Sequence, residues 1–328
     1  MMLGQVRSAL VSQERIVLLT AAALFCLFSI FLKGFLSAGN MVTLVRGVAT
    51  LGILGGGMAI VVIGRGVDLA IVTTYAMSAA WTLHLASLGV AIAPALLLGF
   101  LLAVIIGVIN GVLIAYVEIP ALFATLGMAA LVYGFVRWAL VPLYVVYLPP
   151  SANVVAWIGG GFIWGTPTPI LFFALIAFLG FVFLRFTKQG RFVYAIGDNF
   201  AAARISGAPV RSVIVLQYTI AASIAYVAGM ITATAVSSMN TAVAISPMIY
   251  DVILVVVLGG ISLSGGRGGI RNVLVGTLLI GILLNGMTIM NIEYTLQNVI
   301  RSVILLAAIV LDSLINPRDE QTDQQGDI

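Results

Sequence analysis

The chain has 328 residues, of which 62% are hydrophobic and only 8% are charged, and its mean hydropathy is +1.20. A water-soluble domain carries roughly 25% charged residues, so this composition excludes a soluble fold and predicts an all-α integral membrane protein. The net charge of +4 indicates membrane topology rather than nucleic-acid binding, because cytoplasmic loops collect Lys and Arg. The single cysteine, Cys26, excludes an intramolecular disulfide and a cysteine-rich metal site.

Stretches that lack charged residues, taken in chain order, predict about ten spans, since a transmembrane helix needs roughly 20 residues. These spans cover approximately residues 16–32, 41–63, 69–87, 90–117, 119–136, 169–186, 212–236, 245–263, 272–292 and 294–312. The first follows Glu14 and Arg15 without a cleavage signal and is expected to stay uncleaved. Gly55 to Gly57 mark a possible break in the second span, and SSMN (237–240) predicts a polar turn.

The basic residues set the expected orientation. With the N-terminus in the cytoplasm, Lys33 and Arg137 are external, Arg46 and Arg301 lie within spans, and eleven basic residues are cytoplasmic. The eleven are Arg7, Arg15, Arg65, Arg185, Lys188, Arg191, Arg204, Arg211, Arg267, Arg271 and Arg318. This bias predicts that both termini are cytoplasmic.

The chain is then expected to divide into three parts. These are a cytoplasmic N-terminal segment (1–15), a transmembrane domain (16–312) with a main cytoplasmic loop (187–212), and a polar cytoplasmic tail (313–328). The proline-rich stretch before residue 169 is expected to be an external loop with an interfacial segment.

The main cytoplasmic loop predicts a short helix. Asp198 or Asn199 can accept the unpaired N–H groups at its start, and FAAARIS (200–206) continues it. Gly207 suits the left-handed position after a helix, and Pro209 stops the chain from continuing it. About two turns of helix are not stable alone in water. The segment therefore docks either on the protein's own cytoplasmic face, as a connector, or in the groove of a partner.

This segment, AIGDNFAAARISGAPV (195–210), resembles the coupling helix of the ribose-type permeases, the membrane subunits of bacterial ABC importers for sugars. Further motifs of that family are similar in order and spacing to IGRGVDLAI (63–71), IPALFATLGM (119–128), VVVLGGISLSGGRGGI (255–270) and LLNGM (283–287). The resemblance covers about residues 40 to 312. The chain departs from it at Arg65, where relatives often have glycine, at Phe200, where they often have an acidic residue, and at 71–73.

The resemblance implies a permease subunit that moves a sugar, expected to be a monosaccharide, across the bacterial inner membrane. Its implied partners are an ABC ATPase, a periplasmic sugar-binding protein, a second permease copy or a paralogous permease, and membrane lipid; no nucleic acid is expected. No cofactor is expected on the chain itself, because the ATPase partner binds the ATP. The residues implied to contact the ATPase are Asp198, Asn199, Phe200, Ala201, Ala202, Ala203, Arg204, Ile205, Ser206 and Gly207.

The residues themselves also indicate that the chain does not bind ATP as its own energy source. Only two lysines are present, and neither follows a glycine, so the chain has no phosphate-binding loop of the G-x-x-x-x-G-K-[ST] kind. The chain is therefore expected not to be an enzyme. An ion-coupled carrier would need acidic or histidine relays in its spans, and Asp251 is the only carboxylate clearly within one. Asp251 is expected to pair with Arg46 or Arg301, and His84 to be an interfacial residue.

Two short stretches suggest internal symmetry. NGVLIAYVE (110–118) and NGMTIMNIE (285–293) share Asn-Gly and a later Glu, in spans that run in opposite directions, which favours an inverted repeat of about five plus five helices. Candidate residues of the pathway or gate are Asp68, Asn110, Thr125, Asp251 and Asn285, with Gln217 and Ser223 as further polar candidates. A nucleoside or a branched-chain amino acid remains an alternative solute. The less favoured class is an ion-coupled carrier.

Overall fold

The computed structural model describes the backbone of residues 2–315 and the side chains of residues 14–313. The predicted polar tail (313–328), with Arg318, therefore lies almost entirely outside the described residues. Within the described part, eight helices are long and apolar enough to cross a bilayer. The other two predicted spans correspond to helices of 17 and 12 residues, so eight of the ten predicted spans are confirmed as helices long enough to cross a bilayer.

The first half of the chain contains α1 (Met2–Phe31), α2 (Ala38–Ile63), α3 (Ile71–Ser87), α4 (Ile92–Ala115), α5 (Ala121–Phe135), a π-helical turn (Val136–Leu140), β1 (Val145–Tyr147) and a 3₁₀ helix (Pro150–Val155). The remainder contains α6 (Trp157–Gly160), β2 (Phe162–Ile163), β3 (Thr166–Pro167), α7 (Thr168–Phe186), α8 (Lys188–Asp198), α9 (Phe200–Ile205), α10 (Val210–Ala235), β4 (Ser238–Asn240), a 3₁₀ helix (Thr241–Ile245), α11 (Met248–Gly259), α12 (Ile270–Ile289) and α13 (Tyr294–Ile315).

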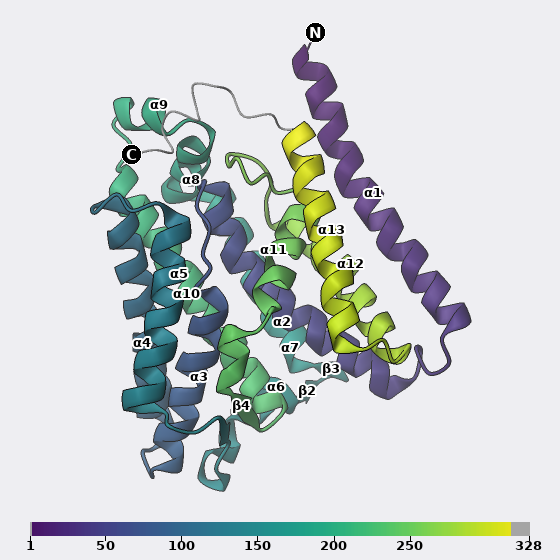
Figure 1. The fold of residues 1–328 in the computed structure, drawn as a ribbon, viewed down its shortest axis with the longest axis vertical. Coiled ribbons are helices and arrows are strands. Elements are labelled where there is room, and N and C mark those ends of the chain that lie inside the picture. The colour runs from purple at the N-terminus through teal and green to yellow at the C-terminus, as the bar shows by residue number, and fades with distance from the viewer. Residues whose placement is uncertain (1, 316–328) are drawn as a thin grey trace.

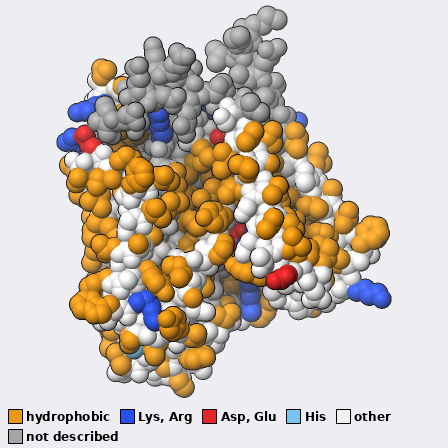
Figure 2. Space-filling view, in the orientation of Figure 1, with side chains coloured by type: hydrophobic (Ala, Val, Ile, Leu, Met, Phe, Trp, Pro, Cys, Tyr) orange, Lys and Arg blue, Asp and Glu red, His pale blue; other side chains and the backbone are white. Residues whose placement is uncertain are grey.

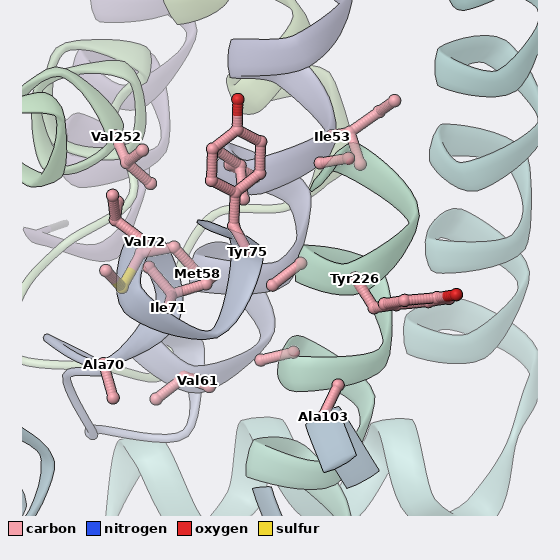
Figure 3. Packing of buried hydrophobic residues seen from close by; sticks show 14 of the residues in the cluster. Ile53, Met58, Val61, Ala70, Ile71, Val72, Tyr75, Ala103, Tyr226 and Val252 are labelled. Atoms are coloured by element: carbon pink, nitrogen blue, oxygen red, sulfur yellow. The ribbon is translucent and has the colours of Figure 1, made fainter. Parts of the chain in front are cut away.

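The helices α2 and α10 form the centre of the bundle (Figure 1). The helix α10 packs against α2, α3 and α4, while α2 also packs against α7, α11 and α12. Of the apolar window of α2, 83% is buried by protein, against 11% for α13. Figure 3 shows the core near this centre, where Met58 of α2, Ile71 of α3 and Val252 of α11 lie in one cluster. The central helices are therefore surrounded by other helices, whereas the outer helices expose most of their surface, as expected of helices that contact lipid.

Apolar side chains also cover the outside of the molecule. On the flank seen in Figure 2, hydrophobic side chains predominate and charged ones are sparse. Exposed examples lie on the outer helices α4, α5, α7 and α13, such as Ile105, Phe123, Phe178 and Val303. A surface of this size would associate or aggregate in water. It is the surface expected of a protein whose outer helices contact lipid hydrocarbon.

The two short helices end at defined backbone features. The helix α11 begins after Pro247 and ends at Gly260, whose φ is +97°. It is therefore shorter than the predicted span 245–263. The segment 64–70 between α2 and α3 is not helical. The predicted break at Gly55 to Gly57 does not occur, because α2 is continuous; Gly57 instead lets α2 approach the Ala221 carbonyl of α10.

Residues 238–240, predicted to be a turn, form strand β4. It pairs antiparallel with β1, with Val146 opposite Met239. The strand has no strong local signal, since its partner lies more than ninety residues earlier in the chain. The loop before α7 also contains the β2–β3 hairpin, in which Phe162 pairs with Pro167. Neither sheet in the described part of the chain has more than two strands.

The beginning and the end of the described chain lie at the same end of the bundle as α8 and α9. Figure 1 shows α8, α9 and the start of α1 at this end. Near the end of α13, Asp312 accepts a hydrogen bond from the Leu263 N–H, in the loop that approaches α8. Because α9 and both ends of the described chain lie together, we refer to this side of the molecule as the α9 end.

We predict that Gly107→Val destabilises the fold. A Cβ at this α4 position would lie 2.6 Å from the Tyr218 carbonyl oxygen of α10, and overpacking of this kind costs about 1–3 kcal/mol. Thermal unfolding in detergent should show a clear fall in the midpoint. The matched control is Gly127→Val in α5, where a Cβ meets no atom within 4 Å. Equal midpoints for the two variants would contradict the packing role of Gly107.

Candidate functional site

The loop between α7 and α10 folds as two helices with side-chain caps. The Thr187 hydroxyl accepts a hydrogen bond from Gly190 N–H at the start of α8, at 2.9 Å. The Asn199 Oδ1 accepts one from Ala202 N–H at the start of α9, also at 2.9 Å. Of the two predicted caps, Asn199 is therefore the one used, and Asp198 ends α8. Gly207 is left-handed, with φ +79°, as the sequence predicts.

The helix α9 presents one face to solvent. Ala202, Arg204 and Ser206 are exposed, and Ile205 is 87% exposed. Ala203 is buried beneath them. Ile205 is therefore an exposed apolar side chain on a capped helix. No neighbouring element of the described chain covers it.

Phe200 behaves differently from the expectation that it faces a partner. Its side chain is half-buried and packs against the protein's own core. The aromatic ring, which stands where relatives often have an acidic residue, therefore anchors α9 to the body of the protein. Ala201 beside it is half-buried as well.

The end of α8 meets two other segments through backbone contacts. The Gly266 N–H donates a hydrogen bond to the Ile63 carbonyl at the end of α2, at 2.8 Å. A Cβ added to Gly197 would collide with that same carbonyl, and one added to Gly266 would lie 2.8 Å from Asp198 Cα. We call Ile63, Gly197, Gly265 and Gly266 the glycine junction. It joins α2, α8 and the loop 260–269 through close backbone contacts.

Further bonds hold this region together. The Tyr194 hydroxyl of α8 donates to the Gly268 carbonyl at 2.8 Å, and burial raises the pKa of this phenol, so it stays protonated. Arg211, at the start of α10, forms an ion pair of 3.1 Å with Glu118 of the α4–α5 loop. Both partners are about half exposed, so the pair contributes at most about 1 kcal/mol. Arg211 is therefore already paired within the chain.

Among the pathway candidates, the structure brings Asp68 and Thr125 together. The Leu69 N–H, next to Asp68, donates to Thr125 Oγ1 at 3.1 Å. The carboxylate of Asp68 is 2% exposed and accepts from Ala70 N–H at 2.9 Å. The Val67 carbonyl accepts from the Tyr218 hydroxyl of α10 at 3.2 Å. These hydrogen bonds pair backbone groups of the non-helical segment 64–70. Asp68 and Thr125 therefore lie where they stabilise this segment.

The backbone conformation at Arg65 accounts for one departure of this sequence from the family pattern. Its φ of +68° is in the left-handed region, where glycine has no steric penalty. The chain therefore turns after α2 at a position whose backbone conformation suits glycine, the residue that the family resemblance implies there. Arg65 Cβ also lies at the glycine junction, 3.0 Å from a Cβ built on Gly265.

The remaining polar candidates do not form one site. Asn285 of α12 exchanges two side-chain hydrogen bonds with Asn40 of α2, at 2.8 and 3.0 Å. Asn110 of α4 is buried, and its Oδ1 has no partner among the described residues. Gln217 of α10 is buried against Gly64, and its Nε2 is likewise unpaired within the described part.

Two further polar residues form no contact that would place them in a common site. Ser223 bonds the Thr219 carbonyl of its own helix, at 2.8 Å. His84, near the end of α3, is half-buried, and its Nδ1 has no partner among the described residues.

Asp251 pairs with Arg301, one of its two predicted partners. The Arg301 Nη1 donates to Asp251 Oδ2 at 2.6 Å, linking α11 to α13, and both side chains are buried. Arg301 also contacts Asn298 of its own helix. Arg46, the other predicted partner, instead donates to the Gly160 carbonyl at 3.3 Å. The ion pair joins an outer helix to the core, so its geometry is that of a structural link.

Sequence patterns did not indicate several of these contacts. In the sequence, Glu118 stands out only as part of the short repeat, and its ion pair with Arg211 spans 93 positions. The glycine junction was visible as Gly-rich motifs, but the motifs did not show which segments meet. The signal that could have found it is the pair of glycines in IGD and SGG, since each permits close backbone approach.

Comparison with known proteins identifies the class. A family model described as "Branched-chain amino acid transport system / permease component" matches residues 40–309. The chain belongs to this family of ABC importer permeases and is a multi-pass inner-membrane protein, in agreement with the eight apolar helices of its described part.

The curated relatives identify the branch as sugar transport. The chain is 28% identical over 302 residues to the ribose import permease protein RbsC of Escherichia coli (strain K12), covering 90% of this chain and 92% of the relative. It is 33% identical over 298 residues to RbsC of Bacillus subtilis (strain 168), covering 88% and 89%. It is 29% identical over 297 residues to the fructose import permease protein FrcC of Rhizobium meliloti, covering 88% and 82%. No solved structure shows significant similarity to the chain.

We predict that Asp251→Asn lowers stability more than transport per folded molecule. Leaving Arg301 buried without its carboxylate costs about 3–5 kcal/mol. The double variant Asp251→Asn/Arg301→Gln should recover a large part of this loss, because it leaves no unpaired charge. Thermal unfolding and transport normalised to folded protein measure the two effects. A folded Asp251→Asn protein that no longer moves solute would assign the residue to the pathway instead.

Proposed function

We propose that the chain is the transmembrane permease subunit of an ABC importer and moves a sugar delivered by a periplasmic binding protein. The observation that carries this proposal is α9, a capped helix whose exposed face contacts nothing in the described chain. It lies directly beside the glycine junction. The sequence has no ATP-binding loop of the Walker type, so a partner ATPase provides the energy and α9 enters its groove.

The glycine junction supports a mechanism for coupling. Gly197 contacts Ile63 at the end of α2, and Gly266 contacts Asp198, so neither contact contains a flexible side chain. Closely packed backbone transmits a displacement because interiors are dense and compress little. A movement of α9 caused by closure of the ATPase dimer would therefore displace the ends of α2 and α12 together.

An inverted repeat is consistent with the packing. The helix α10 packs against α3 and α4, and α2 packs in the same manner against α11 and α12. In each half a short helix, α3 or α11, lies beside a non-helical segment. The helix α4 ends at the α9 end, where Glu118 meets Arg211, and α12 begins there after Gly266. This opposite polarity supports the pairing of NGVLIAYVE with NGMTIMNIE, with Asn110 and Asn285 as equivalent positions.

The names of the relatives favour a sugar, and among sugars a monosaccharide. The relatives named above are import permeases for ribose and fructose. Branched-chain amino acids remain the second candidate, because the family model carries that description. Two buried amides, Asn110 and Gln217, have an unpaired polar atom in the described part of the chain, as do the side chains of Arg46, His84 and Asp251. Amides suit the hydroxyl groups of a sugar better than the charged ends of a free amino acid.

We predict that the α9 end faces the cytoplasm, because it carries most of the basic residues. In a Cys26→Ser background, a cysteine at Ala202 should not react with a membrane-impermeant thiol reagent added to intact spheroplasts. A cysteine at Asn153 should react. Both positions are exposed in the structure, so accessibility depends on the side of the membrane. Labelling at 202 from outside would reverse the orientation.

We also predict that Ala202→Trp uncouples the permease from its ATPase. The indole would overfill a groove that accepts alanine, while the exposed position leaves the membrane core unchanged. The expected result is normal insertion with at least tenfold less ATPase co-purified, or ATPase activity that substrate no longer stimulates. Gly207→Val should act similarly, because its left-handed φ excludes a β-branched residue.

The matched control is Asn153→Trp, an equally exposed position at the opposite end of the molecule. It should insert, retain the ATPase and keep substrate-stimulated hydrolysis. If Ala202→Trp and Gly207→Val both transport at the normal rate, α9 is only a connector on the protein's own surface.

A further inference from the structure

A cavity at the α9 end lies apart from the helix proposed to contact the ATPase. Its volume is about 330 Å³, within the roughly 300–1,000 Å³ range of small-molecule sites. Four helices contribute to it: Glu14 of α1, Arg185 of α7, Tyr194 of α8 and Arg271 of α12. The cavity lies next to the contact between α7 and α12, where a Cβ on Gly180 would meet Ile270 at 2.9 Å.

We propose that this cavity binds the phosphate of an anionic membrane phospholipid, with Arg185 and Arg271 as its ligands. Both arginines are exposed, and neither forms an ion pair of 4 Å or less with another described side chain. Arginine matches phosphate oxygens with paired N–H groups. Two arginines against the one carboxylate of Glu14 leave the cavity with a net positive charge, which favours an anion.

The position of Arg271 supports an anionic ligand. It is the second residue of α12, and no side chain caps the start of that 20-residue helix. A cation at a helix N-terminus is disfavoured by the helix dipole. A bound phosphate would offset that repulsion and accept hydrogen bonds near the helix start.

The surroundings of Arg185 indicate that the anion comes from a lipid. Arg185 lies over the rings of Phe181 and Phe186, at 5.7 and 6.0 Å, which holds its guanidinium at the rim of the cavity. Phe178 and Phe186 of the same helix are more than 60% exposed and belong to the apolar flank. The cavity therefore opens where the lipid-facing surface gives way to basic residues, and this is where headgroup phosphates lie.

Such a lipid would join two helices that otherwise contact each other little at this end. Arg185 is on α7 and Arg271 on α12, while Tyr194 between them already bonds Gly268. A headgroup phosphate would bridge the helix that precedes α8 to the helix that follows the glycine junction. This inference depends on the position of the bilayer boundary and is independent of the proposed sugar and ATPase.

The test measures lipid retained by the full-length chain, purified in detergent and titrated with phosphatidylglycerol, by native mass spectrometry. The variant Arg185→Gln/Arg271→Gln should bind phosphatidylglycerol about thirtyfold more weakly, since each basic residue near an anionic lipid contributes about fivefold. The matched control, Lys188→Gln/Arg191→Gln, removes the same charge from α8, where neither residue lines the cavity. It should bind within about threefold of the wild type.

Three results would overturn the proposal. The first is equal weakening of both variants, which would mean diffuse attraction to surface charge. The second is competition by millimolar inorganic phosphate at unchanged lipid concentration, which would assign the cavity to a free anion. The third is tighter binding of phosphatidylethanolamine than of phosphatidylglycerol, with loss of that preference in Glu14→Gln. Circular dichroism and thermal unfolding verify that the exposed arginines can be replaced without unfolding the protein.

Discussion

Lipid offers no hydrogen bonds to the backbone, and this constraint explains why the non-helical segments are enclosed. Segment 64–70 leaves peptide groups unpaired between α2 and α3, and its neighbours satisfy them. The Val67 carbonyl accepts from Tyr218, and the Leu69 N–H donates to Thr125. In the loop 260–269, Gly266 donates to the end of α2 and Leu263 donates to Asp312. Backbone groups that leave a helix therefore find partners in neighbouring segments of the protein.

The same constraint connects stability to the proposed mechanism. Enclosing two irregular segments requires α2 and α10 to lie at the centre, where glycine positions let backbones touch. Gly107 against α10 and Gly229 against the Tyr75 carbonyl are examples of such close approach. The glycine junction extends this close contact to α8. A protein packed in this way has short, stiff connections between its solvent-exposed end and its core, which suits a subunit driven from outside.

Charged side chains are few, and those discussed above lie at defined places in the fold. The buried pair Asp251–Arg301 joins α13 to the core, and its value lies in avoiding an unpaired ion rather than in adding stability. Around the α9 end, Arg211 is paired with Glu118, whereas Arg185 and Arg271 surround a cavity. These basic residues therefore make different contacts, although all of them lie around the same end of the molecule.

The amino-acid sequence by itself determined the class of molecule. Its apolar windows predicted seven of the eight long helices to within a few residues, because twenty consecutive apolar residues have few other stable arrangements. The eighth, α1, begins at Met2, well before the predicted span 16–32. Local chemistry also predicted the α9 helix, since a cap, an alanine-rich turn and Gly207 act within one short segment. The sequence narrowed the partner of Asp251 to two arginines.

Tertiary structure decided what depends on distant segments. Strand β4 exists because β1 lies beside it, and α11 is shorter than its apolar window because Pro247 and Gly260 bound it. Phe200 turned inward because a core surface was available to it. The choice of Arg301 over Arg46, the meeting of Gly197 with Ile63, and the separation of Asn110 from Asn285 all follow from the packing of helices. Such contacts join residues far apart in the chain, and periodicity along one segment carries no information about them.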